Sequence, residues 1–186
     1  MIDFLKNTDT QLFLFLNGKH NEFFDVLMWW ISYKYTWIPL YILLLFLVWK
    51  KFAKKTFLVV ISIAVLILLS DQISVHFFKN VFERWRPCHN LLLKEKVHLV
   101  GDCGGTFGFI SSHAANTFAL AIFLSLILRK RNFTLLIFAW AALGSYSRIY
   151  LGVHYPSDIF AGALLGCIIG FIIWHLFNIA EKKFSI

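Results

Sequence analysis

Long apolar stretches alternate with short clusters of Lys and Arg along this chain, and this alternation restricts the fold most strongly. Five stretches approach the roughly 20 apolar residues that a helix needs to cross a bilayer: residues 36–49, 56–70, 114–128, 133–147 and 158–178. Hydrophobic residues fill 59% and charged residues 15% of the 186 positions, whereas soluble domains usually carry about 45–50% and about 25%. We therefore predict an all-α, polytopic transmembrane helical bundle of about five spans rather than a water-soluble globule.

The N-terminal region, residues 1–33, is apolar but interrupted. Its stretches 11–16 and 23–30 are separated by a polar run that includes Asn17 and Lys19. An interfacial helical segment fits this pattern best, and a sixth, irregular span is the alternative. The region lacks the basic start and long apolar core of a secretory signal, so we expect it to be retained. Residues 1–186 are predicted to form one membrane-embedded domain.

The Lys and Arg residues indicate the orientation of the bundle. Of 18 cations and 10 acids, nine cations and one acid, Glu181, fall on one side of the five predicted spans. By the positive-inside rule that side is cytoplasmic, which places the C-terminus inside and the loop 80–112 outside. The nine cations are Lys50, Lys51, Lys54, Lys55, Arg129, Lys130, Arg131, Lys182 and Lys183. The net charge of +8 therefore reports orientation, and no nucleic-acid partner is expected.

Three polar clusters lie on the predicted outer side. In the first, Lys79 and Arg86 are seven residues apart, so a continuous helix would place both on one face, about 10 Å apart along its axis. Two cations that snorkel to lipid headgroups are the alternative reading. The second cluster, residues 108–116, offers Ser111 and Ser112 as N-caps and His113 beside an anion-binding helix start. A capped helix with an interfacial His is the alternative there.

The third cluster, residues 147–158, joins the last two spans. Pro156 suits the first turn of a helix, and Asp158 follows just inside it. His154 lies four residues earlier, where a carboxylate can hold the ring through its Nδ1 proton and leave Nε2 free to act as a nucleophile or base. Arg148 supplies a planar fork of donors for an anion.

The three clusters together resemble the type 2 phosphatidic acid phosphatase superfamily. The resemblance rests on K-x6-R-P at residues 79–87, S-S-H-A at 111–114 and S-R-x5-H-x3-D at 147–158. The usual middle motif of that superfamily is Pro-Ser-Gly-His, and here Ile110 and Ser112 replace the Pro and the Gly. The resemblance implies a helical membrane lipid phosphatase.

Site roles follow from the same resemblance. It implies that His154 is the nucleophile, that Asp158 orients it, and that His113 acts as the general acid. It also implies that the phosphate is bound by Lys79, Arg86, Ser111 and Arg148, with the amide of Ser112 as a helper. Phosphoryl transfer is mainly positioning and charge stabilisation, and three cations suffice for that, so we expect no metal and no cofactor.

Three further features carry expectations. Asp71, near Gln72 and His76 in the second span, is expected to partner a site cation or to tune catalysis, because ionisable residues inside membranes are costly. Gly162, Gly166 and Gly170 are expected to allow close helix packing within the bundle rather than dimerisation. Cys88 and Cys103 lie 15 residues apart in the outer loop, where a disulfide is the preferred prediction. A zinc site with His89 and His98 is the alternative, and Cys167 is expected only to pack.

These observations predict a lipid phosphatase at the outer face of a bacterial inner membrane. It would hydrolyse a phosphomonoester or pyrophosphate through a phospho-histidine. The resemblance implies four candidate substrates, which are undecaprenyl pyrophosphate, phosphatidylglycerol phosphate, phosphatidic acid and the phosphates of lipid A, and the sequence does not choose among them. A phosphotransferase and a non-catalytic lipid-binding or transport protein are the alternatives. The sequence leaves the oligomeric state open.

Overall fold

In the computed structural model the described residues, 2–183, form helices and one isolated β-bridge, between Trp85 and Phe107. Met1 and residues 184–186, the ends of the predicted domain, lie outside the described part. The longer helices are α1 (Ile2–Asn17), α2 (Glu22–Ser32), α3 (Ile38–Phe52), α4 (Thr56–Ile73), α6 (Ser112–Leu128), α7 (Arg131–Tyr150) and α8 (Pro156–Lys183). Short helical segments are η1 (Lys34–Trp37), η2 (Ala53–Lys55), η3 (Ser74–Lys79), α5 (Asn80–Phe82) and η4 (Pro87–His89).

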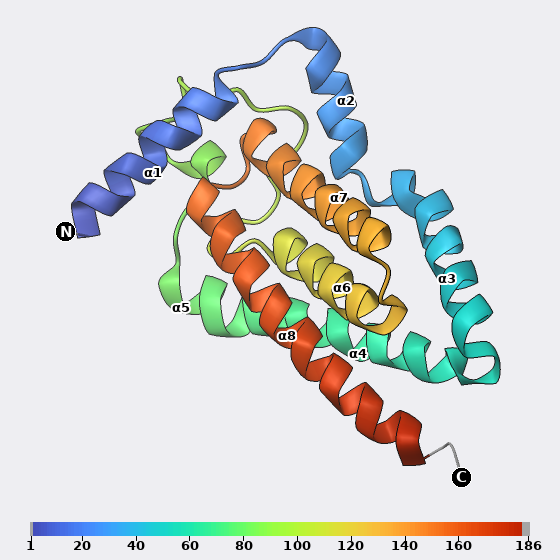
Figure 1. Cartoon of the computed structure of the whole chain (residues 1–186). Coiled ribbons are helices and arrows are strands. Elements are labelled where there is room, and N and C mark those ends of the chain that lie inside the picture. Colours follow the sequence, from blue (N-terminus) through green and yellow to red (C-terminus); the bar gives the residue numbers. More distant parts are fainter. Residues whose placement is uncertain (1, 184–186) are drawn as a thin grey trace.

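Helix α6 is the centre of the bundle and packs against α4, α7 and α8 (Figure 1). It is apolar on all sides, which is typical of a helix surrounded by protein. Ala114, Ala115 and Ala119 are fully buried, and these small side chains bring the neighbouring helices close. The central position matters for the site, because α6 begins at Ser112, within the second polar cluster.

Three glycines of α8 explain how closely it lies against α6. A Cβ atom added to Gly166 would lie 2.2 Å from the carbonyl oxygen of Ala115, and one added to Gly162 would lie 2.5 Å from that of Ser111. At Gly170 it would meet Ile122 at 2.3 Å. The expected packing of these glycines within the bundle is confirmed, and it fixes the start of α8 beside the start of α6.

The N-terminal helices form a pair that docks on the rest of the bundle. α1 lies across the bundle near the start of α8, and α2 packs along α7 (Figure 1). Phe13 of α1 is fully buried and meets the Tyr155 ring edge-on at a centroid distance of 5.4 Å. Asn17 donates to the carbonyl oxygen of Tyr150 at 2.7 Å and accepts from the amide of His98 at 2.8 Å. The segment is thus joined to the bundle by specific contacts.

Two helical segments are long and apolar enough to cross a membrane: Lys34–Phe82, which contains a turn at η2, and Pro156–Lys183. Helix Ser112–Leu128 is apolar but shorter. The all-helical fold agrees with the sequence, while the count of five spans stays a prediction. One local expectation is wrong: the helix that carries Lys79 ends at Phe82, where Glu83 adopts a left-handed conformation with φ of 45°. Arg86 therefore lies in an extended loop and not on the helix of Lys79.

The two ends of the bundle differ in their charged residues. At one end, which we call the basic end, lie η2, the turn between α6 and α7, and the end of α8 (Figure 1). Lys51 there donates to the carbonyl oxygen of Ile127 at 2.6 Å, near the end of α6. The opposite end, which we call the site end, holds α1, the loop 83–111 and the start of α8. All nine cations of the cytoplasmic prediction lie toward the basic end.

Candidate active site

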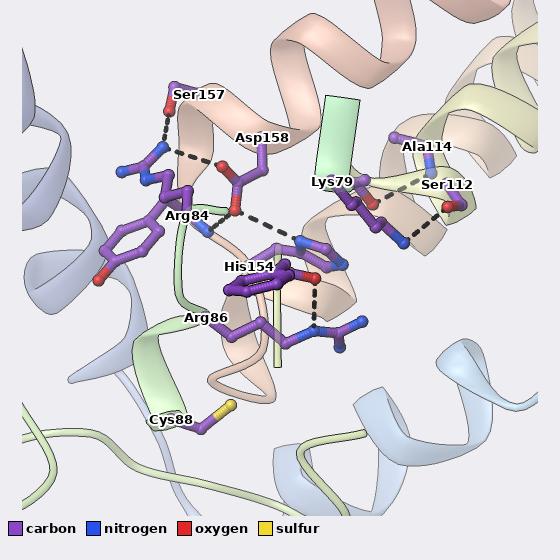
Figure 2. Close-up of polar contacts among 12 residues, drawn as sticks. Lys79, Arg84, Arg86, Cys88, Ser112, Ala114, His154, Ser157 and Asp158 are labelled. Atoms are coloured by element: carbon purple, nitrogen blue, oxygen red, sulfur yellow. Dashed lines mark hydrogen bonds and ion pairs between the residues drawn. The ribbon is translucent and has the colours of Figure 1, made fainter. Parts of the chain in front are cut away.

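The three polar clusters of the sequence meet at the site end (Figure 2). The loop after α5 brings Arg86, the start of α6 brings Ser111, and the turn between α7 and α8 brings His154. These side chains are buried: Arg86 is 9%, Ser111 0% and His154 2% exposed. The Arg86 side chain points into the protein and not toward lipid headgroups, which argues against the alternative interpretation of the first cluster as snorkelling cations.

His154 and Asp158 form the centre of the site. Nδ1 of His154 lies 3.4 Å from Oδ2 of Asp158, and the same oxygen accepts from the amide of Tyr155 at 3.0 Å. Pro156 begins α8 as expected, so Asp158 sits in its first turn and faces back toward His154. Burial lowers the pKa of His154 to about 4 although Asp158 opposes this shift. The imidazole is therefore neutral at physiological pH, as a nucleophile must be.

The cations Lys79 and Arg86 are each held by a neutral acceptor. Lys79 donates to the hydroxyl of Ser112 at 2.8 Å (Figure 2), and that hydroxyl also lies 2.6 Å from the hydroxyl of Ser74. Arg86 donates to the carbonyl oxygen of Cys103 at 2.9 Å. Neither interaction neutralises the charge, so both cations remain able to attract an anion.

Arg148, the third cation, comes from the last turn of α7. One of its terminal nitrogens donates to the hydroxyl of Ser32, at the end of α2. Its Nε is buried without a hydrogen-bond partner among the described residues, which leaves a donor that a bound anion would satisfy. A cavity of about 200 Å³ adjoins Arg148 and is lined by Trp29, Tyr33 and Asp102 among others.

The start of α6 contributes the second cluster. Ser111 is the N-cap, and its hydroxyl accepts from the amide of Ala114 at 3.3 Å, while its own amide donates to the carbonyl oxygen of Asp158 at 3.0 Å. The ring of His113 faces α7, where a Cβ added to Gly144 would lie 3.3 Å from its Nε2. Ile110, which stands in place of the usual Pro, is fully buried.

The outer loop closes over Arg86. Cys88 and Cys103 are joined by a disulfide with Cα atoms 6.1 Å apart, and His89 is 3.1 Å from the carbonyl oxygen of Gly104. His98 instead pairs with Asp25 at 2.9 Å. These four Cys and His side chains do not gather into a metal site, and no group of three potential ligands occurs within residues 2–183.

Sequence reasoning missed two charged residues beside Asp158. Arg84 donates to Oδ1 of Asp158 at 2.9 Å and to Oδ2 of Asp9 at 2.7 Å, and Figure 2 shows it on the side of Asp158 away from His154. Asp9 belongs to α1, 75 residues earlier than Arg84. The position of Arg84, two residues before Arg86, was the only sequence signal for it, and Asp9 had none.

An apolar cavity of about 410 Å³ lies between the pair α3 and α4 and the pair α6 and α7. Asn116, one turn after His113 on α6, lines it together with Trp140. Oδ1 of Asn116 and Nε1 of Trp140 are buried and lack hydrogen-bond partners in the described part of the chain. The cavity is thus mainly apolar, and its polar side chains are those of Tyr41, Asn116, Thr117 and Trp140.

A comparison with known protein families identifies the family to which this chain belongs. Residues 58–182 match the model of the PAP2 superfamily. The chain belongs to this superfamily. The matched range includes all of the polar clusters and the helices α6, α7 and most of α8, whereas α1, α2 and α3 precede it.

Two curated PAP2 relatives cover almost the whole chain. A lipid A 4'-phosphatase of Bacteroides thetaiotaomicron is 43% identical over 185 residues, which is 98% of this chain and 81% of the relative. A lipid A 4'-phosphatase of Porphyromonas gingivalis is 37% identical over 184 residues, 98% of this chain and 78% of the relative.

A solved structure agrees on the fold. The crystal structure of a PAP2-type phosphatidylglycerolphosphate phosphatase from Bacillus subtilis superimposes with a TM-score of 0.71 at 19% identity. The match covers 96% of this chain and 87% of that chain. At this identity the likeness shows the fold of the PAP2 protein and not its substrate.

Proposed function

We propose that this protein removes a phosphate group from the sugar headgroup of a lipid of the lipid A type, at the outer face of a bacterial inner membrane. The observation that carries the chemistry is the buried pair of His154 and Asp158 beside Lys79, Arg86 and Arg148. The two relatives that cover almost the whole chain act on lipid A by name, and they support the choice of substrate among lipid phosphates. The basic end supports a cytoplasmic C-terminus.

The reaction proceeds in two displacements. Nε2 of His154 attacks phosphorus and forms the N–P bond, while the bond from phosphorus to the sugar oxygen breaks and His113 protonates that leaving oxygen. A water then attacks phosphorus, gives its proton back to His113, and releases phosphate as the N–P bond breaks. Asp158 stabilises the positive ring of His154 in both steps, and the three cations bind the phosphoryl oxygens where negative charge accumulates.

Lys79, Arg86 and Arg148 bind the phosphoryl oxygens together with Ser111 and the amide of Ser112. The hydroxyl of Ser112 also orients Lys79, because it accepts a hydrogen bond from the ammonium group at 2.8 Å. The mainly apolar lining of the cavity beside Asn116 suits an acyl chain of the same lipid.

Phosphate release from a lipid panel tests this function. The panel contains lipid A with its phosphates, undecaprenyl pyrophosphate, phosphatidylglycerol phosphate and phosphatidic acid, each assayed with EDTA. We expect the highest kcat/KM on lipid A and a loss of at least about 1,000-fold in His154→Ala, the scale seen when a catalytic nucleophile is removed. His175→Gln on α8 is the matched control and should keep full activity.

The outcomes separate the parts of the proposal. Activity that persists in His154→Ala, or that EDTA abolishes, contradicts the phospho-histidine mechanism. A preference for the prenyl pyrophosphate contradicts the substrate but not the mechanism. Label transferred to an added lipid or sugar acceptor, instead of to water, identifies the phosphotransferase alternative.

A further inference from the structure

We infer that Arg84 and Asp9 are positioning residues for the reaction, because they fix the orientation and the effective charge of Asp158 and so control His154. Arg84 lies within the first cluster, at residues 79–87, but the sequence assigned a role to neither Arg84 nor Asp9. The inference rests on the proposed role of His154 as nucleophile. It assigns to α1, which precedes the range matched by the superfamily model, a direct part in setting up the site.

The geometry of Arg84 leaves its guanidinium little freedom. NH1 donates to Oδ1 of Asp158 at 2.9 Å and to the hydroxyl of Ser157 at 2.6 Å, and NH2 donates to Asp9 at 2.7 Å. The plane also stacks on the ring of Tyr155, with its central carbon 3.9 Å from the ring centroid. A planar fork held on both arms and on one face is well suited to orient a carboxylate.

This arrangement divides the two oxygens of Asp158 between different tasks. Oδ1 accepts from Arg84, and Oδ2 faces His154 and the amide of Tyr155. The contact of Oδ2 with Nδ1 of His154 is 3.4 Å, longer than a strong hydrogen bond. The carboxylate plane is therefore set mainly by Arg84 and the Tyr155 amide, and the ring of His154 takes its direction from that plane.

Acidic and basic side chains alternate along a row of contacts that leads from α1 to His154. Asp9, Arg84, Asp158 and then His154 follow one another, and Asp158 is fully buried. Arg84, which is paired with Asp158, weakens the attraction of that carboxylate for a positively charged ring of His154, because the two positive groups compete for one carboxylate. Arg84 thus helps to keep His154 neutral before the reaction, together with Arg86 and Arg148, which also disfavour the charged ring.

Asp9 is itself held by two contacts with Ser157, at the start of α8. Its Oδ1 accepts from the amide of Ser157 at 2.9 Å, 148 residues away, and its Oδ2 meets the Ser157 hydroxyl. Phe13, one turn further along α1, packs on Tyr155. Asp9 therefore ties Arg84 to the first turn of α8, the turn that carries Asp158.

The test is the pH dependence of kcat/KM on a phosphomonoester lipid for the full-length protein. Arg84→Gln should lower kcat about tenfold, because the carboxylate of Asp158 and the ring of His154 lose their orientation, and it should leave KM within about twofold. The acid limb, which is the low-pH side of the pH profile of kcat/KM, should move upward by about one pH unit. The limb moves up because Asp158, freed of Arg84, favours protonation of His154. Groups that face His154 from the other elements, His113, Arg86 and Arg148, are unchanged in this variant.

Three further variants separate the effect of the positive charge of Arg84 from the effect of losing its hydrogen bonds. Arg84→Lys retains the cation, so its acid limb should stay near that of wild type although kcat falls. Asp9→Asn should also lower kcat, but its limb should not rise, because it removes a negative charge from the row. Lys94→Gln removes an exposed cation from the same outer loop and should change neither quantity.

An acid limb in Arg84→Gln that matches wild type overturns the inference, as does an equal rise in Arg84→Lys. If Arg84→Gln does not fold, the inference depends on Asp9→Asn, and full kcat in that variant overturns it. These results are distinct from failure of the proposed function, which shows as activity in His154→Ala whatever Arg84 does.

Discussion

Cations at the basic end are largely exposed, among them Lys50, Lys54 and Lys130, whereas Arg86 at the site end is only 9% exposed. The exposed cations sit at short turns and helix ends and face solvent, where charge costs little. The three cations at the site end are each held by a specific acceptor in the protein: Lys79 by Ser112, Arg86 by Cys103 and Arg148 by Ser32. The difference teaches that the predicted orientation rests on the number of cations at one end, whereas the proposed chemistry rests on their placement at the other.

The largest expected effect contrasts one cation from each end. Arg86→Gln should lower kcat/KM about 100- to 1,000-fold, the scale for loss of one donor that stabilises a developing oxyanion. Lys130→Gln, which removes an exposed cation of the basic end, should leave kcat/KM within about twofold. Initial rates of phosphate release in detergent micelles measure both, and an equal loss in the two variants would remove the functional distinction between the ends.

A second prediction tests the packing that connects the ends. Gly166→Ala places a methyl group 2.2 Å from a carbonyl oxygen of α6, so it should destabilise the fold by about 1–3 kcal/mol, the usual cost of overpacking. Gly105→Ala in the outer loop is the control, since nothing lies within 4 Å of its added methyl group. The thermal unfolding midpoint should fall only in Gly166→Ala. Equal midpoints would mean that α8 can move away from α6 at little cost.

A third prediction concerns pH at the site end. Because burial lowers the pKa of His154 to about 4, kcat/KM should hold down to about pH 5 and fall about tenfold per unit below pH 4. In the unfolded chain His154 is exposed to water and its pKa is near 6.5, so the free energy of unfolding should rise with pH between about 4 and 6.5. An activity midpoint near pH 6.5 would show that His154 is solvated in the working enzyme.

The smallest expected effect comes from the disulfide of the outer loop. Cys88→Ser combined with Cys103→Ser should lower kcat/KM several-fold, because the cross-link restricts the loop whose carbonyl at Cys103 holds Arg86. Cys167→Ser, within α8, should have no effect on activity. Reductant added to wild type should reproduce the double variant, and reductant without any effect would show that the loop holds Arg86 unaided.

Sequence reasoning captured the parts of the site that are local. His154, Pro156 and Asp158 lie within five residues, and helix geometry alone relates them. The fold class followed from hydropathy, and the close packing of α8 from the spacing of its glycines. What escaped prediction was long-range pairing: Arg84 with Asp9, and Arg148 with Ser32 across 116 residues. Such partners depend on how α1 and α2 dock, which no local pattern specifies.

The sequence also failed to predict where one helix ends. The spacing of Lys79 and Arg86 suited one helix face, yet Glu83 ends that helix in a left-handed conformation, and no Gly or Pro stands there to announce it. Ser112 is a related case: the sequence offered it as an N-cap and as an amide donor, whereas Ser111 is the N-cap and the Ser112 hydroxyl contacts Lys79 and Ser74.

The contact between Asp9 and Ser157 also bears on biogenesis. Ser157 is added to the growing chain 148 residues after Asp9, so the row of charges from α1 to α8 can form only after the first turn of α8 has been synthesised. Until then Arg84 lacks the carboxylate of Asp158, and His154 lacks the carboxylate that faces its ring.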